Sequence, residues 1–423
     1  MTMELKKLGA IGGAISLALC WPLAVGQIGQ SVIQDGVTHL NSDSVRAEVI
    51  EYDRGYLSSQ ITTRYTVIDP ILAEQLVVDG LPTELVVNSQ VSHGLFSLSA
   101  ESVLENVDDL PLTLETVTQL NGNTEYILKL DHWNQVTEGQ DGAIVSVSPS
   151  TLSGHVTVLG DMTYQLDVPS VEIDFNSGEK MVLSGLQGEG EGKKVDSFWI
   201  GEQTLKLARA AIVSGEQSPL FALSDSQYRF VSSFDEAAKT VSSQHIVELN
   251  KLVTSEGDVD SVSLDFAFGD LDSEAFAHLI TLYQNNPVPS NDDIQTAIPY
   301  VDSLFSKGFY LAINKMEVNL NQQSRFETTW SINVPKGTDN VTQNMAMILP
   351  ALTGDIDTYF SNGLVTQYPF IQQGIDEAMV MELMQQNDTG YRIKAQLKEG
   401  SLLFENGQEI PLMALLMPAL MQP

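Results

Sequence analysis

Hydrophobic and polar residues alternate one by one over much of the chain. The stretch Gln60–Ile68, QITTRYTVI, places Ile61, Tyr65 and the other odd-numbered residues on one side of an extended backbone. The same alternation returns at residues 126–130, 156–158, 162–168, 171–175, 262–268, 326–334 and 391–397. Because strands with one apolar and one wet side pair in antiparallel sheets, the sequence predicts an extended, antiparallel-sheet-rich body.

One predicted strand changes phase along its length. Phe309, Leu311 and Ile313 are followed by Met316 and Val318, so the apolar positions shift by one residue. Since such a shift would turn the rest of the strand over, the pattern predicts a β-bulge.

Helices are predicted in the second half of the chain. One begins at Ser273, a capping residue, and ends before Pro287. The next runs from Ser290 to Gly308, and Pro299 is expected to kink it.

A third helix is predicted from about Pro369 to Asn387, where apolar residues recur at four-residue steps. The segment Gly185–Lys194, GLQGEGEGKK, is predicted to be a hairpin tip or a flexible loop. With helices covering part of the C-terminal sheet, the predicted fold class is α+β.

The N-terminal stretch Leu8–Gly26 has a different pattern, because it contains no charged residue and follows Lys6 and Lys7. As a helix it would be about 28 Å long, close to the thickness of a bilayer's hydrocarbon core. We expect one transmembrane helix here, acting as a signal anchor with its N-terminus in the cytoplasm. The residues expected in the membrane are Leu8, Ile11, Ile15, Leu19 and Trp21.

A cleavable signal peptide is the alternative for this stretch, since Ala24–Gly26 offers small residues at a cleavage position. Lipid attachment at Cys20 is set aside because Leu19, which is not small, precedes it. The predicted organisation is residues 1–34 as the membrane anchor or signal peptide, 35–240 as a β-rich region and 241–423 as an α+β region.

The chain is strongly acidic, with 55 Asp and Glu against 21 Lys and Arg, a net charge of -34. This argues against binding to nucleic acid and against adsorption to anionic head groups. Cys20 is the only cysteine, so the exported body can form neither an internal disulfide nor a cysteine-based metal site.

We find no catalytic or metal-binding motif in the sequence. GxSxG and HExxH are absent, and the six histidines lack metal-ligand spacing. Asp174–Gly178 resembles half of a calcium loop, but Gly185 stands where the final glutamate is required. The sequence therefore predicts no catalytic residue, no cofactor and no metal site.

Methionine and other apolar residues are concentrated near the C-terminus. Eight of the 13 methionines lie from Met345 onward, and Ile410–Pro423 is almost wholly apolar. This segment is expected either to pack on the sheet as a closing helix or to form an adaptable apolar surface.

Four short motifs, in the same order along the chain, resemble those of the YdgA family of bacterial envelope proteins. They are Glu51–Gln60 (EYDRGYLSSQ), Ser92–Leu98 (SHGLFSL), Gly269–Phe276 (GDLDSEAF) and Asn406–Gln408. The resemblance implies an inner-membrane anchor with a periplasmic body, and no assigned reaction.

The family-like positions also have structural explanations. They are Arg54, Gly55, His93, Gly94, Phe96, Asn406 and Gly407. We expect Gly55 to supply a special backbone angle at a turn, His93 and Gly94 to form a turn or bend, and Asn406-Gly407 to form a hairpin.

Three functional hypotheses follow. The leading one is a membrane-anchored, non-enzymatic envelope factor that binds an apolar ligand, such as a lipid, or an envelope protein along a long sheet. The second is a structural scaffold or homodimer without ligand. The third is an unrecognised periplasmic hydrolase, which requires a polar pocket with convergent groups such as His93 with an Asp or Ser.

Overall fold

The computed structural model describes residues 29–31, 33–34, 37–38, 41–42, 44–78, 82–105, 107, 110–136, 142–215, 219–285, 289–343 and 348–414. The chain divides into two compact units. Unit 1 comprises the chain up to Ser177 together with Gly185–Glu191. Unit 2 comprises Gly178–Ser184 and the chain from Gly192 onward.

Unit 1 is built from antiparallel strands. Its strands are β1 (Val45–Arg54), β2 (Ser58–Val67), β3 (Glu84–His93), β4 (Ser97–Leu104), β5 (Leu112–Gln119), β6 (Thr124–Leu130), β7 (Trp133–Val136), β8 (Ala143–Val147), β9 (Ser150–Val156) and β10 (Asp161–Phe175). They pair in the order β1-β2-β3-β4-β5-β6-β9-β10. Strand β8 continues the line of β9 along the same edge of β10, and β7 pairs with β8 in line with β6. Helix α2 (Pro70–Val78) lies between β2 and β3 in the chain, and β11 (Glu179–Val195) contains residues of both units.

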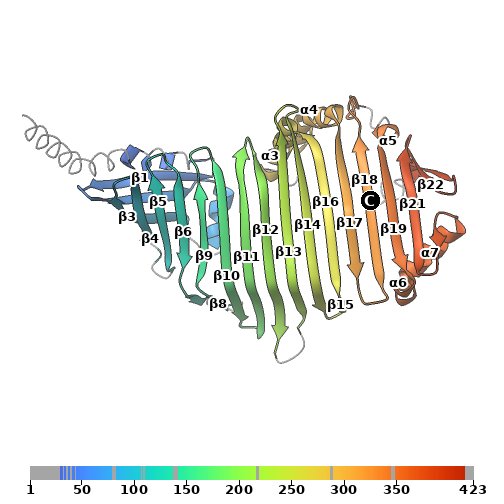
Figure 1. The fold of residues 1–423 in the computed structure, drawn as a ribbon, viewed down its shortest axis with the longest axis horizontal. Helices are drawn as coiled ribbons and strands as arrows, with labels where there is room; N and C mark the ends of the chain where they lie inside the picture. Colours follow the sequence, from blue (N-terminus) through green and yellow to red (C-terminus); the bar gives the residue numbers. More distant parts are fainter. Residues whose placement is uncertain are drawn as a thin grey trace, which may run out of the picture. The chain divides into compact units, whose positions relative to one another are not determined.

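Unit 2 continues with longer antiparallel strands. These are β12 (Phe198–Ser214), β13 (Phe221–Asp235), β14 (Thr240–Thr254), β15 (Gly257–Val259), β16 (Ser261–Asp272), β17 (Phe309–Asn319), β18 (Arg325–Val334), β19 (Thr353–Ser361), β20 (Gln385–Gln386), β21 (Gly390–Lys398), β22 (Ser401–Phe404) and β23 (Glu409–Pro411). Their order is β12-β13-β14-β16-β17-β18-β19-β21-β22-β23, with β15 beside β14 and β20 beside β21 (Figure 1).

The predicted antiparallel, sheet-rich body is confirmed in both units. The predicted bulge is also present, because the register of β17 against β18 shifts between Ile313 and Met316. The neighbouring pair β16–β17 shifts between Asp265 and Phe266. The bulge keeps the apolar residues of the long strand on one side of the sheet.

The helices of unit 2 are α3 (Ser273–Asn285), α4 (Asn291–Lys307), α5 (Ile348–Ala351), α6 (Asn362–Gln367) and α7 (Pro369–Val380). Helix α4 begins with a capping box between Ser290 and Asp293, and Gly308 closes it as predicted. Helix α3 likewise matches its prediction.

Two local predictions are wrong. The segment 185–194 is not a loop but part of strand β11, where a Cβ on Gly192 would lie 2.8 Å from the ring of Trp199, so glycine allows that ring to approach. Helix α7 ends at Val380, and Gln385–Gln386 joins the sheet as β20.

The transmembrane part of the predicted fold class is corrected. Among the residues that the structure describes, no helix is long and apolar enough to cross a membrane. The longest described helix, α4, has 17 residues and carries Asp292, Asp293 and Lys307. The residues predicted to lie in the membrane (Leu8, Ile11, Ile15, Leu19 and Trp21) are outside the described part of the chain.

Candidate functional site

The family-like glycines form two equivalent turns in unit 1, one between β1 and β2 and one between β3 and β4. The Gly55 N–H donates to the Ser58 carbonyl at 2.8 Å, and the Gly94 N–H donates to the Ser97 carbonyl at 2.9 Å. A Cβ on either glycine would lie 2.8 Å from that same oxygen, so these tight turns require glycine. Arg54 is the last residue of β1, and Phe96, in the second turn, is 68% exposed.

His93 connects these two turns. Its Nε2 lies 2.9 Å from the Ser59 hydroxyl, and its Nδ1 lies 3.3 Å from the Tyr56 carbonyl. Its backbone N–H donates to the Leu57 carbonyl at 2.7 Å. Because His93 is 7% and Ser59 only 1% exposed, this pair is enclosed by the sheet and its turns, whereas a hydrolase would need it in an open pocket.

Asn406 and Gly407 lie in the turn between β22 and β23, as a hairpin. Gly407 has φ 85° and donates its N–H to the Phe404 carbonyl at 2.9 Å. The Asn406 side chain accepts from the Gln408 N–H at 3.0 Å and donates to the Glu382 carbonyl at 2.6 Å. Both residues therefore have turn-forming roles.

The two faces of the unit 2 sheet have opposite chemistry. Directly opposite residues of an antiparallel pair point to the same side, so the register assigns each residue to a face. One side, here called the charged face, contains ion pairs within and between neighbouring strands: Arg229–Glu202, Lys315–Glu317, Arg325–Glu317, Arg325–Glu327, Arg392–Asp357 and Lys394–Asp357.

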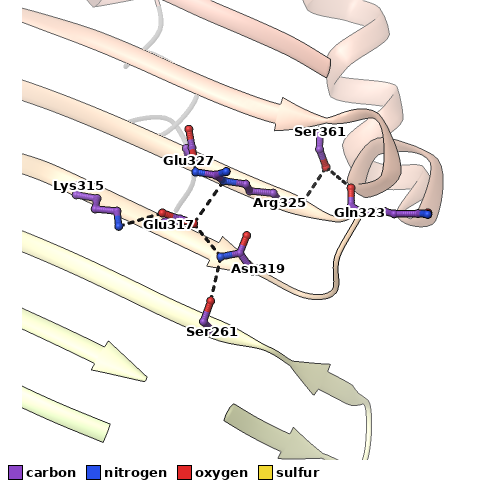
Figure 2. A network of polar contacts seen from close by, with 8 residues as sticks. All are labelled: Ser261, Lys315, Glu317, Asn319, Gln323, Arg325, Glu327 and Ser361. Carbon is purple, nitrogen blue, oxygen red and sulfur yellow. Dashed lines mark hydrogen bonds and ion pairs between the residues drawn. The ribbon is translucent and has the colours of Figure 1, made fainter. Parts of the chain in front are cut away.

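Figure 2 shows the part of the charged face at the end of β17 and the start of β18. Glu317 accepts from Asn319 at 2.8 Å and lies 3.0 Å from Lys315 and 3.4 Å from Arg325. The hydrogen bond from Asn319, together with Lys315 and Arg325, lowers the pKa of Glu317 from its usual value. This face is therefore suited to water.

Farther along the same face, Arg392 binds Asp357 with two nitrogens, Nε and Nη2, each 2.6 Å from a carboxylate oxygen. This bidentate hydrogen bonding lowers the pKa of Asp357.

The other side of the same strands, here called the apolar face, carries mainly hydrophobic side chains, interrupted by polar ones such as Ser226 and Thr328. It comprises Leu205, Leu207, Tyr228, Val247, Leu249, Val262, Leu264, Ile313, Met316, Val318 and Trp330, which the register places on one side. Val247 is 36% exposed, and the other members are half-buried. A sheet face of this composition is normally buried against a second layer, so its partial exposure is unusual.

Helices cover the ends of the apolar face. Near the start of β14, Phe276 of α3 contacts Phe268 with ring centroids 5.7 Å apart, in a cluster that includes Val241 and Leu271 (Figure 1). At β19 and β21, helices α6 and α7 pack through Val365 and Ile375. The half-buried residues of the apolar face lie between these two helical covers.

Several polar side chains on this side of the sheet bond to one another. His245 Nδ1 lies 2.8 Å from the Tyr228 hydroxyl, and its Nε2 lies 3.0 Å from the Ser243 hydroxyl. Thr328 and Thr358 pair at 2.8 Å. Burial lowers the pKa of His245, which favours the neutral ring, and raises the pKa of Tyr228. The surface thus offers an incoming ligand apolar contact and few free hydrogen-bonding groups.

We find no metal centre in the described part of the chain, where no group of three or more His, Cys, Asp or Glu side chains could hold an ion. The half calcium loop at Asp174–Gly178 forms the turn between β10 and β11, with Gly178 at φ 89°.

The alternation of apolar residues predicted which residues share a side, but it did not predict that this side is half exposed. The sequence analysis also missed Arg209. In the β12 segment QTLKLARAAIVS, Leu205 and Leu207 are followed two residues later by Arg209, an arginine at an apolar-face position. That break in the alternation was the available signal.

The fold and its two faces define an antiparallel, sheet-rich protein whose unit 2 sheet has one charged and one partly exposed apolar face. The model of a bacterial family described as protein of unknown function (DUF945) matches residues 5–413, so the chain belongs to this family. An uncharacterised bacterial family is what the sequence resemblance implied, although the name YdgA is not confirmed. Comparison with curated proteins and with solved structures found no match.

Proposed function

We propose that this protein is a non-enzymatic factor of the bacterial envelope that binds the acyl chain of a lipid on the apolar face of unit 2. The observation that carries the proposal is the partial exposure of neighbouring hydrophobic side chains from β12 to β18, opposite a face of ion pairs. Covering this surface would release water from apolar area at about 25 cal/mol per Å².

An acyl chain suits this face better than a protein partner. Protein interfaces typically contain about one hydrogen bond per 100–200 Å². Here the backbone groups are paired along the strands, and Tyr228, His245 and Ser243 satisfy one another. An acyl chain has no hydrogen-bonding groups that could be left unpaired on this face. A protein surface would bury some of its own polar groups there without partners.

The proposal is tested with the purified, delipidated full-length protein and parinaric acid, a fluorescent fatty acid. Val247→Asp places a carboxylate against the acyl chain and should weaken binding about tenfold or more. Val247 is already 36% exposed, so the variant should remain folded. Asn250→Asp adds the same charge to the opposite side of β14 and should leave the affinity unchanged, as should the conservative Val247→Leu.

Equal loss of affinity in Val247→Asp and Asn250→Asp would contradict a site on the apolar face. Absence of parinaric acid binding, with a dimer seen by light scattering that Val247→Asp dissociates, would instead favour a second copy of the chain as the partner.

A further inference from the structure

Arg209 lies at one end of the apolar face. It is on β12, on the same side as Leu205 and Leu207, and its cross-strand neighbour is Ser224. The side chain is exposed, and no ion-pair partner for it exists in the part of the chain that the structure describes. In a chain of net charge -34, an arginine without a carboxylate partner beside hydrophobic residues is unexpected.

Lys251 shares the same row of the sheet, because Ser224 also lies opposite it on β14. Its ammonium group is held by Asp258 at 3.2 Å and Asp260 at 3.1 Å. These two carboxylates neutralise Lys251, so Arg209 is the cation of this row that is available to an anionic ligand.

The row of Arg209 and Lys251 lies at one end of the apolar face. The hydrophobic cluster at helix α3 covers the other end. From Lys251 to His245, strand β14 spans about 20 Å at about 3.3 Å per residue. Phe230 and Phe266 flank His245, with ring centroids 5.1 and 6.1 Å away. The acyl chains of one leaflet fill about 15 Å, half of a hydrocarbon core of about 30 Å. One extended acyl chain therefore fits along the strands between the aromatic cluster and Arg209.

We propose that Arg209 binds the anionic head group of the lipid, a carboxylate or a phosphate, while the acyl chain lies along β13 and β14. The guanidinium group presents two parallel N–H donors that match either anion. This inference rests on the proposed function and names the ligand class: a lipid with an acyl chain and an anionic group at its end.

The test compares stearic acid with methyl stearate, which has the same chain without the charge, by displacement of parinaric acid from the full-length protein. The wild type should bind the acid about tenfold more tightly than the ester. Arg209→Gln should reduce the affinity for the acid to that for the ester and leave the ester unchanged. Lys206→Gln removes a cation from the opposite side of the same strand and should affect neither ligand.

Octadecyl phosphate distinguishes the two head groups. A larger loss for this ligand than for stearic acid in Arg209→Gln would identify phosphate as the preferred group, and the reverse would identify carboxylate. If the wild type binds acid and ester equally, or Lys206→Gln loses as much affinity for the acid as Arg209→Gln, the role of Arg209 is overturned while the proposed function stands. If none of the three ligands binds, both fail.

Discussion

Ser59 and His93 are 34 positions apart in the chain but meet inside unit 1, with 2.9 Å between the hydroxyl and Nε2. The motifs around them, YLSS and SHG, were noticed in the sequence because of a family resemblance. Their contact could not be predicted, since it depends on the pairing of β2 with β3 and on the turn at Gly55. The structure gives these residues a structural role, because the buried Ser59 hydroxyl and the buried His93 ring are hydrogen-bond partners of each other.

Replacing Ser59 with alanine tests this role. Ser59→Ala leaves the buried Nε2 of His93 without a partner, and we expect the free energy of unfolding in urea to fall by about 1–3 kcal/mol. Ser58→Ala, at the exposed neighbouring position, should cost much less. Labelling of Ser59 in the folded protein by a fluorophosphonate probe, with no change in stability for Ser59→Ala, would contradict the structural role and favour a hydrolase.

At the scale of secondary-structure elements, the periodicity of the sequence predicted strands β16, β17, β18 and β21 of unit 2 and the bulge near Ile313, and Gly308 predicted the end of α4. These features depend on residues that are close together in the sequence, so a single sequence is enough to predict them. The strand at 185–194 was missed because glycine usually weakens strands, and only the tertiary contact of Gly192 with Trp199 explains it.

The charged face makes a prediction about stability and pH. Because Arg392 lowers the pKa of Asp357, the unfolded chain takes up the proton first as the pH falls. The contribution of this pair is therefore complete above the usual Asp pKa of about 4 and is lost as the pH falls through the lowered value.

We expect Arg392→Gln to reduce the free energy of unfolding by up to about 1 kcal/mol at neutral pH, since the pair is partly exposed. The difference from the wild type should shrink below about pH 4 in urea titrations. Arg229→Gln removes an ion pair in which both side chains are exposed, so its effect on the free energy of unfolding should be smaller. A difference that grows at acidic pH would show that the sign of the linkage is wrong.

At the scale of the whole molecule, charge and apolar surface are separated within unit 2. The leading hypothesis from the sequence was an apolar ligand or a protein partner along a long sheet, and the structure shows that one side of the unit 2 sheet is apolar and half exposed. The sequence could not predict the open state of that side, because alternation is the same whether or not a second layer covers the strands. The role proposed for Arg209 likewise needs the register, which places it in one row with Lys251.

Trp330 provides a direct probe of the central claim, because it lies on the apolar face between Ile313 of β17 and Ile356 of β19. Replacing Trp21, Trp133 and Trp199 by Phe leaves Trp330 as the only tryptophan among the four in the sequence. Since the ring nitrogens of Trp133 and Trp199 are buried without a hydrogen-bond partner, removing them should cost little stability.

The decisive measurement is the fluorescence of this single-tryptophan protein during titration with stearic acid brominated at mid-chain, whose bromine quenches only on contact. Acyl-chain binding on the apolar face predicts that the brominated acid quenches Trp330 in step with binding, whereas unbrominated stearic acid does not. Binding of the brominated acid with unchanged Trp330 emission would contradict the account.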